Sequence, residues 1–241
     1  MKPTVSIIVP AYNEEKYISK TLDSLQNQTY KDYEIIVVNN NSTDNTQKIA
    51  KKYVKRVYSE KKQGYHHAIN RGIKEAKGTI LTVCDADTVY PKNWLQKVVP
   101  LFKIPHVIAV YGPALYCDGN FLLKYIGGFV YVMIYHISHL LGVDITGGYN
   151  FLFTRKAYQQ SGGYNAKKFT MYGLDIELGT RLKKIGKVKF SPSSIVYIST
   201  RRMQKDGYLK IANMCTKIWL NFFLKRPQTI TYDEYMKGVR Y

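Results

Sequence analysis

The chain has 241 residues, of which 45% are hydrophobic and 14% aromatic, so it is long enough for one domain with a substantial core. Its formal net charge is +19, from 36 basic and 17 acidic residues, which indicates an anionic partner such as a nucleotide, a phospholipid surface, a pyrophosphate carrier or a nucleic acid. The three cysteines, Cys84, Cys117 and Cys215, have no paired spacing, which argues against both a disulfide framework and a zinc site.

The basic residues are spread unevenly along the chain. Residues 1–50 carry 5 basic and 6 acidic side chains, whereas residues 151–241 carry 18 and 5. A core-like strand follows Met1 almost at once, so we expect no signal peptide. The expected location is the cytosol or the cytosolic face of a membrane.

Strands and helices are predicted to alternate in the first half of the chain. Short apolar runs predict strands at residues 5–10, 34–38, 57–58 and 79–84. Helical spacing predicts a helix whose buried face carries Ile18, Leu22 and Leu25, followed by helices at 44–53, 64–76 (closed by Gly78) and 91–102. This alternation implies right-handed crossovers, and therefore an α/β fold with a mostly parallel, Rossmann-like sheet flanked by helices.

Two carboxylates, Asp85 and Asp87, follow the buried strand at 79–84 directly. Ligands of open α/β sheets bind at the carboxyl ends of the strands. Two oxygen donors at that place suit a hard divalent cation that keeps positions free for substrate phosphates. The alternative is a loop in which one of the two aspartates caps the next helix.

Five segments in order resemble the motifs of family 2 glycosyltransferases. They are residues 5–14 (VSIIVPAYNE), 36–46 (IVVNNNSTDNT), 68–78, 147–156 and 173–182 (GLDIELGTRL). The resemblance covers about residues 4–190 and implies a GT-A fold, a nucleotide-diphosphate sugar as donor, and a Mg²⁺ or Mn²⁺ ion. It implies a GT-A domain at 1–200, with a nucleotide-sugar half at 1–112 and an acceptor-side half at 113–200.

The resemblance also implies roles for individual residues. Asp87 would ligate the metal, and Asp85 would bind ribose hydroxyls or the metal. Nucleotide contacts are implied for Pro10, Ala11, Tyr12, Glu14, Asn39, Asp85 and Ala86. Asn39 stands where the family usually has an aspartate, so the identity of the nucleotide base is not implied. Alternatively, Tyr12 could pack against the edge of the sheet, and Glu14 could lie in the first turn of a helix.

Asp175 is implied as the catalytic base of an inverting transfer, and its alternative is an acid in the first turn of a helix. Glu177 lies about 200° further round that helix, so it cannot face the same site. It is placed to pair with Arg181. The stripe predicted to be buried comprises Leu174, Leu178, Leu182 and Ile185.

Two further segments bear on the acceptor. Residues 125–143 contain no charged residue and predict a helix that either lies in a membrane interface or is buried over the acceptor cleft. Residues 201–241 are expected to form a basic amphipathic helix and tail, which bind an anionic membrane surface or dock on the domain. Arg201 and Arg202 could contact the diphosphate. The predicted acceptor is therefore a saccharide or a polyprenyl-linked lipid.

Two other classes of function remain as alternatives. A nucleotidyltransferase also uses paired aspartates but normally needs a Gly-rich phosphate loop, and residues 10–20 contain no glycine. A basic nucleic-acid-binding protein would fit the net charge. It is disfavoured because no recognition motif is present and the basic excess is separate from the best motifs, so no nucleic acid is expected as partner.

Overall fold

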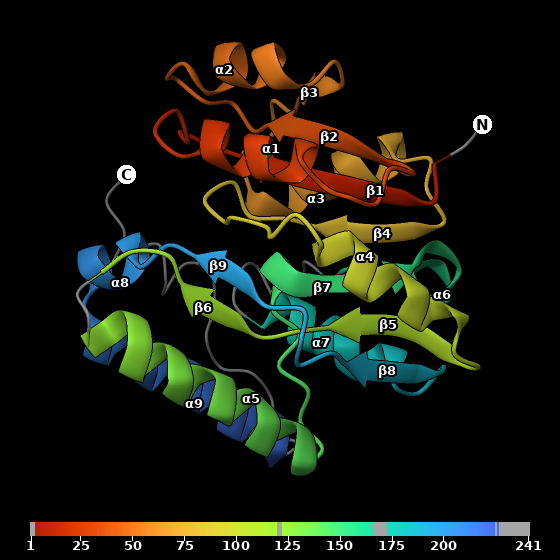
Figure 1. Cartoon of the computed structure of the whole chain (residues 1–241), viewed down its shortest axis with the longest axis vertical. Coiled ribbons are helices and arrows are strands. Elements are labelled where there is room, and N and C mark those ends of the chain that lie inside the picture. The colour runs from red at the N-terminus through yellow and green to blue at the C-terminus, as the bar shows by residue number, and fades with distance from the viewer. Residues whose placement is uncertain (1–2, 120–121, 166–172, 225, 227–241) are drawn as a thin grey trace.

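The computed structural model describes residues 3–119, 122–165, 173–224 and 226. A seven-stranded sheet forms its centre, with the strand order β3-β2-β1-β4-β7-β5-β8 (Figure 1). The bounds are β1 Val5–Ala11, β2 Tyr33–Asn39, β3 Val57–Ser59, β4 Ile80–Val83, β5 Val107–Tyr111, β7 Phe151–Thr154 and β8 Lys187–Phe190. Only β7 runs antiparallel to its neighbours, β4 and β5. The predicted mostly parallel sheet is thus confirmed.

Helices cover both faces of this sheet. The faces separate because the side chains of β1 alternate: Val5, Ile7 and Val9 join one core cluster, and Ile8 joins the other. The first cluster receives α1 (Ile18–Gln26), α2 (Thr46–Tyr53) and α4 (Trp94–Val98). The second receives α3 (Tyr65–Glu75), α6 (Arg155–Gln160) and α7 (Leu174–Leu182).

Two details of the predicted helices differ from the structure. The helix predicted at 64–76 is α3 with Gly64 as its N-cap and Ala76 as its C-cap, but Gly78 does not close it. Gly78 instead allows close packing, because a Cβ there would lie 2.6 Å from the backbone nitrogen of Ser6. The helix expected at 91–102 is α4 followed by a 3₁₀ helix at Val99–Lys103, since Pro100 has no N–H to continue an α-helix.

The buried side-chain amide of Asn150 connects three segments that are distant in the sequence. Asn150 is fully buried, and its Nδ2 donates to the carbonyls of Pro113 (3.0 Å) and Ser194 (2.5 Å). Its Oδ1 accepts from the indole N–H of Trp94 at 2.9 Å. Asn150 therefore ties α4 to the segments that flank a second, two-stranded sheet of β6 (Ala114–Tyr116) and β9 (Val196–Ile198).

Replacing Asn150 with Ala should destabilise the fold, because it leaves the Trp94 indole N–H and the Ser194 carbonyl without these partners, whereas the Pro113 carbonyl keeps the N–H of Val196. Each such loss costs about 1–3 kcal/mol, so we expect the free energy of unfolding to fall by about 3 kcal/mol or more in urea titrations. The control is Asn70→Ala, an exposed amide on α3, which should change it by less than about 0.5 kcal/mol. Equal effects of the two substitutions would contradict the role of Asn150.

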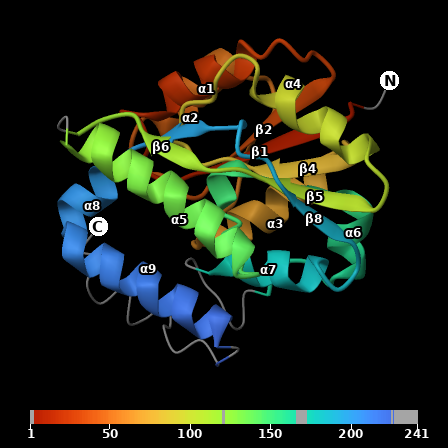
Figure 2. The same ribbon diagram turned by 60° about the horizontal axis from the view of Figure 1, so that its bottom comes forward.

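Two helices form the lower part of the molecule as Figure 1 shows it. They are α5 (Gly128–Leu140), which follows a π-helical turn at Leu122–Gly127, and α9 (Tyr208–Phe223), which follows the short α8 (Arg201–Asp206). The two helices run side by side (Figure 2), and the indole N–H of Trp219 donates to Ser138 Oγ at 2.7 Å. Within the described residues, no helix combines the length and the apolar character that crossing a bilayer requires.

Candidate active site

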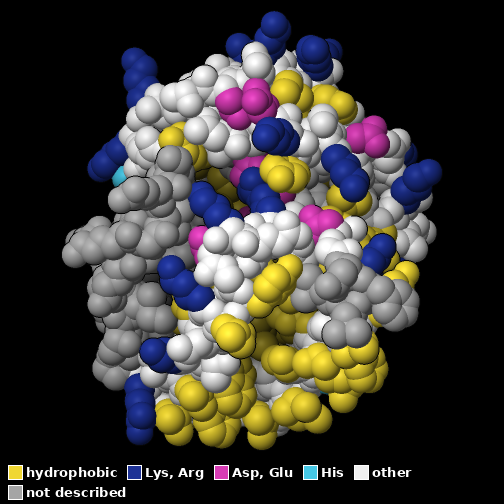
Figure 3. All heavy atoms as spheres, turned by 90° about the vertical axis from the view of Figure 1, so that its left-hand side faces the viewer, with side chains coloured by type: hydrophobic (Ala, Val, Ile, Leu, Met, Phe, Trp, Pro, Cys, Tyr) yellow, Lys and Arg dark blue, Asp and Glu magenta, His cyan; other side chains and the backbone are white. Residues whose placement is uncertain are grey.

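The carboxyl ends of three neighbouring parallel strands, β2, β1 and β4, lie at one edge of the sheet. The chain passes from β1 to β2 on one side and returns to β4 on the other, which makes this edge a switch point where open α/β sheets bind ligands. Pro10 and Ala11 end β1, Asn39 ends β2, and residues 84–87 follow β4. Figure 3 looks onto this edge and shows acidic side chains in a hollow bordered by lysines and arginines.

The loops that follow β1 and β2 are hydrogen-bonded to each other. Asn13 has a left-handed φ of 52°, which Asn tolerates better than most residues, and its Oδ1 accepts from the backbone N–H of Thr43 at 2.9 Å. The N–H of Glu14 donates to Thr46 Oγ1 at 2.7 Å. These bonds fix the backbone between Tyr12 and Glu14 against the start of α2.

Asp85, Ala86 and Asp87 form the turn that leaves β4. The Ala86 carbonyl accepts from Thr21 Oγ1 at 2.8 Å, which holds the turn against α1. Asp85 Oδ1 accepts from the hydroxyl of Tyr65 at 3.2 Å. Burial raises the pKa of Asp85, and the charge of Asp87 raises it further, so the pair favours a nearby cation. Neither aspartate caps the next helix, because the N-cap of α4 is Asn93.

A guanidinium from the C-terminal part of the chain reaches this turn. Arg201 Nε donates to Asp87 Oδ2 at 2.7 Å, and a terminal nitrogen donates to Glu14 Oε1. Burial raises the pKa of Glu14 to about 7, although the hydrogen bond and the charge of Arg201 act in the opposite direction. Glu14, Asp87 and Arg201 therefore form one partly buried ionic cluster.

Asp175 lies in the first turn of α7 and faces the same region as Asp85. Its Oδ1 accepts from the hydroxyl of Tyr164 at 2.8 Å. A Cβ on Gly148 would lie 2.8 Å from Asp175 Oδ2 and 3.4 Å from the hydroxyl of Tyr65, which binds Asp85. Burial raises the pKa of Asp175 to about 7, with a further contribution from the charge of Asp85. Asp85, Tyr65, Gly148 and Asp175 are thus contiguous.

Glu177 lies on the other side of α7, as the helical spacing predicts. Its two carboxylate oxygens accept from Arg181 Nε at 2.6 Å and from a terminal nitrogen at 2.7 Å. Three of the four leucine and isoleucine positions of the predicted stripe are fully buried, but Ile185 is 41% exposed. The prediction for Ile185 is wrong because α7 ends at Leu182.

The donor set fits a divalent cation that also binds substrate. Among the described residues, no group of three or more His, Cys, Asp or Glu side chains gathers as a complete metal site. Asp85 and Asp87 supply hard oxygen donors and leave other positions to phosphate oxygens, as Mg²⁺ sites commonly do. In the described part of the chain, Glu14 Oε2 and Asn39 Oδ1 are buried without a hydrogen-bond partner, so polar atoms remain for a ligand.

The sequence motifs missed three of the residues that shape this site. Tyr65 and Tyr164 carry no motif signal, since tyrosine occurs 22 times in the chain and only the fold brings these two to Asp85 and Asp175. Gly148 belongs to the quoted 147–156 segment, but its closeness to Asp175 could not be deduced from spacing. The sequence predicts that Arg201 could contact the diphosphate, but it does not predict the ion pairs of Arg201 with Glu14 and Asp87, which depend on tertiary structure.

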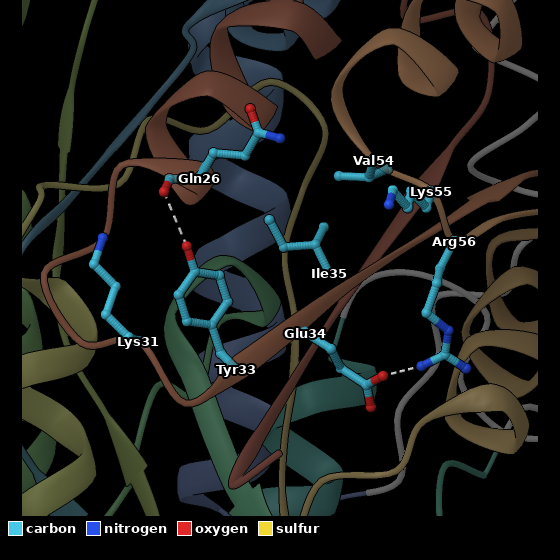
Figure 4. A pocket seen from close by; sticks show the side chains of 8 residues that line it. All are labelled: Gln26, Lys31, Tyr33, Glu34, Ile35, Val54, Lys55 and Arg56. Atoms are coloured by element: carbon cyan, nitrogen blue, oxygen red, sulfur yellow. Dashed lines mark hydrogen bonds and ion pairs between the residues drawn. The ribbon is translucent and has the colours of Figure 1, made fainter. Parts of the chain in front are cut away.

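A separate pocket lies at the opposite end of β2. It has a volume of about 460 Å³ and is lined by Gln26, Lys31, Tyr33, Glu34, Ile35, Val54, Lys55 and Arg56 (Figure 4). The carboxylate of Glu34 pairs with Arg56 beside it. None of its lining residues was predicted as a site residue, and the pocket faces away from the carboxyl ends of the strands.

The chain is similar in sequence to known glycosyltransferases. Residues 6–162 match the family described as Glycosyl transferase family 2. An uncharacterized glycosyltransferase of Rickettsia felis is 28% identical over 98% of this chain and 40% of its own length. The uncharacterized glycosyltransferase EpsJ of Bacillus subtilis is 41% identical over 41% of this chain and 30% of its own length. The chain therefore spans two fifths or less of these curated relatives.

Solved structures with the same fold contain nucleotides and metals. The mannosyltransferase PcManGT from Pyrobaculum calidifontis, in complex with GDP-Man and Mn²⁺, has a TM-score of 0.71 at 20% identity and covers 95% of this chain and 66% of its own. Glucosyl-3-phosphoglycerate synthase from Mycobacterium tuberculosis, in complex with Mn²⁺, UDP and phosphoglyceric acid, has a TM-score of 0.66 at 19% identity and covers 94% and 80%. These likenesses confirm the GT-A-like fold.

Proposed function

Because the chain belongs to glycosyl transferase family 2, we propose that it transfers a sugar from a nucleoside-diphosphate donor to an acceptor, with inversion at the anomeric carbon. The observation that carries this proposal is the contiguity of the Asp85–Asp87 turn with Asp175 through Tyr65 and Gly148. In this proposal the donor diphosphate lies on one flank of the sugar and the Asp175 carboxylate lies on the other. The nucleotide-sugar half comprises residues 1–112, and the acceptor-side half comprises residues 113–200.

The donor nucleotide binds across the carboxyl ends of β1, β2 and β4. Tyr12 supplies a flat face for the base, and Asn39, whose buried Oδ1 has no partner among the described residues, reads a polar edge of the base. Glu14 and Asp85 accept hydrogen bonds from ribose hydroxyls. The backbone that surrounds the nucleotide is supplied by Pro10, Ala11 and Ala86.

Asp175 is the general base of the reaction. Its carboxylate accepts the proton of the acceptor hydroxyl while that oxygen bonds to the anomeric carbon and the bond from this carbon to the diphosphate breaks. The nucleoside diphosphate leaves with the electron pair of the broken bond. Tyr164 holds one carboxylate oxygen by its hydroxyl, and the other oxygen lies beside Gly148. Asp87, aided by Asp85, would hold a Mg²⁺ or Mn²⁺ ion, which would stabilise the charge that develops on the leaving diphosphate.

The acceptor is a saccharide or a polyprenyl-linked lipid, held by a protein that lies peripherally on the cytosolic face of a membrane. The exposed apolar side chains of α5 and α9 support this part of the proposal. We name this set the apolar face; it comprises Phe129, Val130, Met133, Ile134, Ile137, Leu140, Leu141, Leu209, Leu220, Phe223 and Leu224. Hydrophobic side chains gather at the bottom of the view in Figure 3, below the acidic hollow. Exposed lysines at 210 and 217 on α9 suit anionic headgroups.

The membrane proposal predicts that Ile134→Glu weakens binding to vesicles containing phosphatidylglycerol by roughly 10- to 100-fold, because an interfacial isoleucine contributes about 1.5–3 kcal/mol when buried. Cosedimentation measures the bound fraction. The matched control is Ile185→Glu, since Ile185 is 41% exposed against 45% for Ile134 but lies outside the apolar face. Equal binding of wild type and Ile134→Glu, or no binding by wild type, would remove the membrane from the proposal.

The pH dependence of transfer follows from the raised pKa of Asp175. The base acts as a carboxylate, so lowering the pH through its pKa of about 7 protonates it and removes activity. We expect the maximal rate to fall about tenfold per pH unit well below 7 and to be level above it. An acidic limb that remains near pH 4, the ordinary range of an aspartate, would contradict the assignment.

The experiment that tests the proposed function measures products. The protein is incubated with UDP-, GDP- or dTDP-sugars and Mn²⁺, with simple saccharides and polyprenyl phosphates as acceptors. Free nucleoside diphosphate together with a glycosylated acceptor is the expected result. Release of pyrophosphate would indicate nucleotidyl transfer instead. Salt-dependent binding of any DNA duplex, without sugar transfer, would favour the nucleic-acid alternative.

A further inference from the structure

Arg201 makes three contacts that place a positive charge within the site predicted for the cation. Its Nε donates to Asp87 Oδ2 at 2.7 Å, and a terminal nitrogen donates to Glu14 Oε1. The guanidinium carbon lies 4.6 Å from the centre of the Tyr17 ring, within the range of a cation–π interaction. The side chain is 29% exposed, and the carboxylates that it pairs with are 13% and 16% exposed.

The backbone that carries Arg201 is also held in place. Asp118 accepts from the backbone N–H of Thr200 at 2.6 Å and from Ser199 Oγ at 2.7 Å. Glu14 is 187 positions away from Arg201 in the sequence, so the guanidinium joins the C-terminal part of the chain to the loop after β1. These contacts hold the Arg201 side chain in the site in the absence of substrate.

A divalent cation held by Asp87 would share this carboxylate with the guanidinium of Arg201. A metal ion on Asp87 would stand beside a guanidinium bonded to Asp87 Oδ2, and two positive charges at that range repel strongly in a partly buried site. The partly buried carboxylates of Glu14 and Asp87 also need a counter-charge when no metal is present. Arg201 supplies that charge.

We propose that Arg201 is an internal counter-ion that competes with the divalent cation for Asp87 and moves to the diphosphate when the donor binds. The inference rests on the proposed function only in taking a nucleoside diphosphate as ligand. Its consequence is that metal alone binds weakly and that metal and nucleoside diphosphate strengthen each other's binding, as linkage requires. Arg201 is thus a positioning residue that makes productive metal binding depend on the donor.

The test measures Mn²⁺ binding by electron paramagnetic resonance, with the metal alone and with saturating UDP or GDP. We expect Arg201→Gln to bind Mn²⁺ alone about tenfold more tightly than wild type, within the usual range of coupling between sites. The enhancement by nucleotide should shrink by a similar factor. Arg226→Gln is the matched control, because it removes an exposed guanidinium beyond the far end of α9, and it should bind Mn²⁺ as wild type does.

Unchanged or weaker binding of Mn²⁺ alone by Arg201→Gln would overturn the proposal. A second measurement uses wild type, so that it does not depend on the variant folding: the Nε–H resonance of Arg201 should shift when Mg²⁺ and nucleoside diphosphate are added together. A resonance that stays in place while both ligands bind would also overturn it. Sugar transfer is assayed separately, so a protein that shows the coupling but transfers no sugar would contradict the proposed function alone.

Discussion

Asp175→Asn is expected to lower the rate of sugar transfer by about 10²–10⁴-fold, the usual contribution of a general base, while donor binding stays within about twofold. The amide keeps the size of the side chain and its hydrogen bond from Tyr164, but it cannot accept the acceptor's proton. The rate of nucleoside diphosphate release in the presence of acceptor measures the first effect. Calorimetric titration with the nucleotide-sugar measures the second.

The control for this substitution is on the same helix. Glu177→Gln removes a carboxylate two residues further along α7, where Glu177 pairs with Arg181, and it keeps the side chain's ability to accept a hydrogen bond. We expect it to retain most of the activity. If Asp175→Asn kept full activity, or if both variants lost it equally, Asp175 would not be the base.

Asp87→Asn is expected to have a comparable effect through a different step. It replaces the carboxylate that Arg201 contacts with a neutral amide, a much weaker ligand for Mg²⁺ or Mn²⁺. We expect transfer to fall by about 10³-fold, because stabilising the leaving diphosphate is worth several kcal/mol. Unlike Asp175→Asn, this variant should also lose the dependence of donor binding on metal, which calorimetry with and without Mn²⁺ detects.

The control for Asp87→Asn is Asp23→Asn, which neutralises an exposed aspartate on α1 and should leave both metal binding and transfer unchanged. Full activity of Asp87→Asn with undiminished Mn²⁺ binding would show that the metal is held elsewhere.

Much of the nucleotide side of the fold follows from local sequence. The buried run at 5–10 and the β-branched strands at 34–38 and 79–84 became β1, β2 and β4, because fully buried parallel strands read as continuous apolar runs. The place of Asp85 and Asp87 at a strand end follows from the same pattern. Short-range signals were therefore sufficient for these three strands.

The other side of the site depends on contacts that sequence spacing does not encode. Tyr65 meets Asp85 across 20 positions and Arg201 meets Asp87 across 114. The environment of residues 125–143 could not be predicted from the sequence either, because an uncharged run fits a buried helix and an interfacial helix equally well. Only the structure shows that α5 buries Tyr135 and Ser138 while Phe129 is 66% exposed and Leu140 84% exposed, so one face of the helix packs on the domain and the other face is exposed.

The most direct measurement is a crystal structure of the protein with an unreactive nucleotide-sugar analogue and Mn²⁺. The anomalous signal should place the metal on Asp87 and the diphosphate. The anomeric carbon of the sugar should lie between that diphosphate and the carboxylate of Asp175, with room for an acceptor hydroxyl beside the carboxylate. A metal bound away from Asp87, or a sugar whose anomeric carbon faces away from Asp175, would contradict the proposed mechanism.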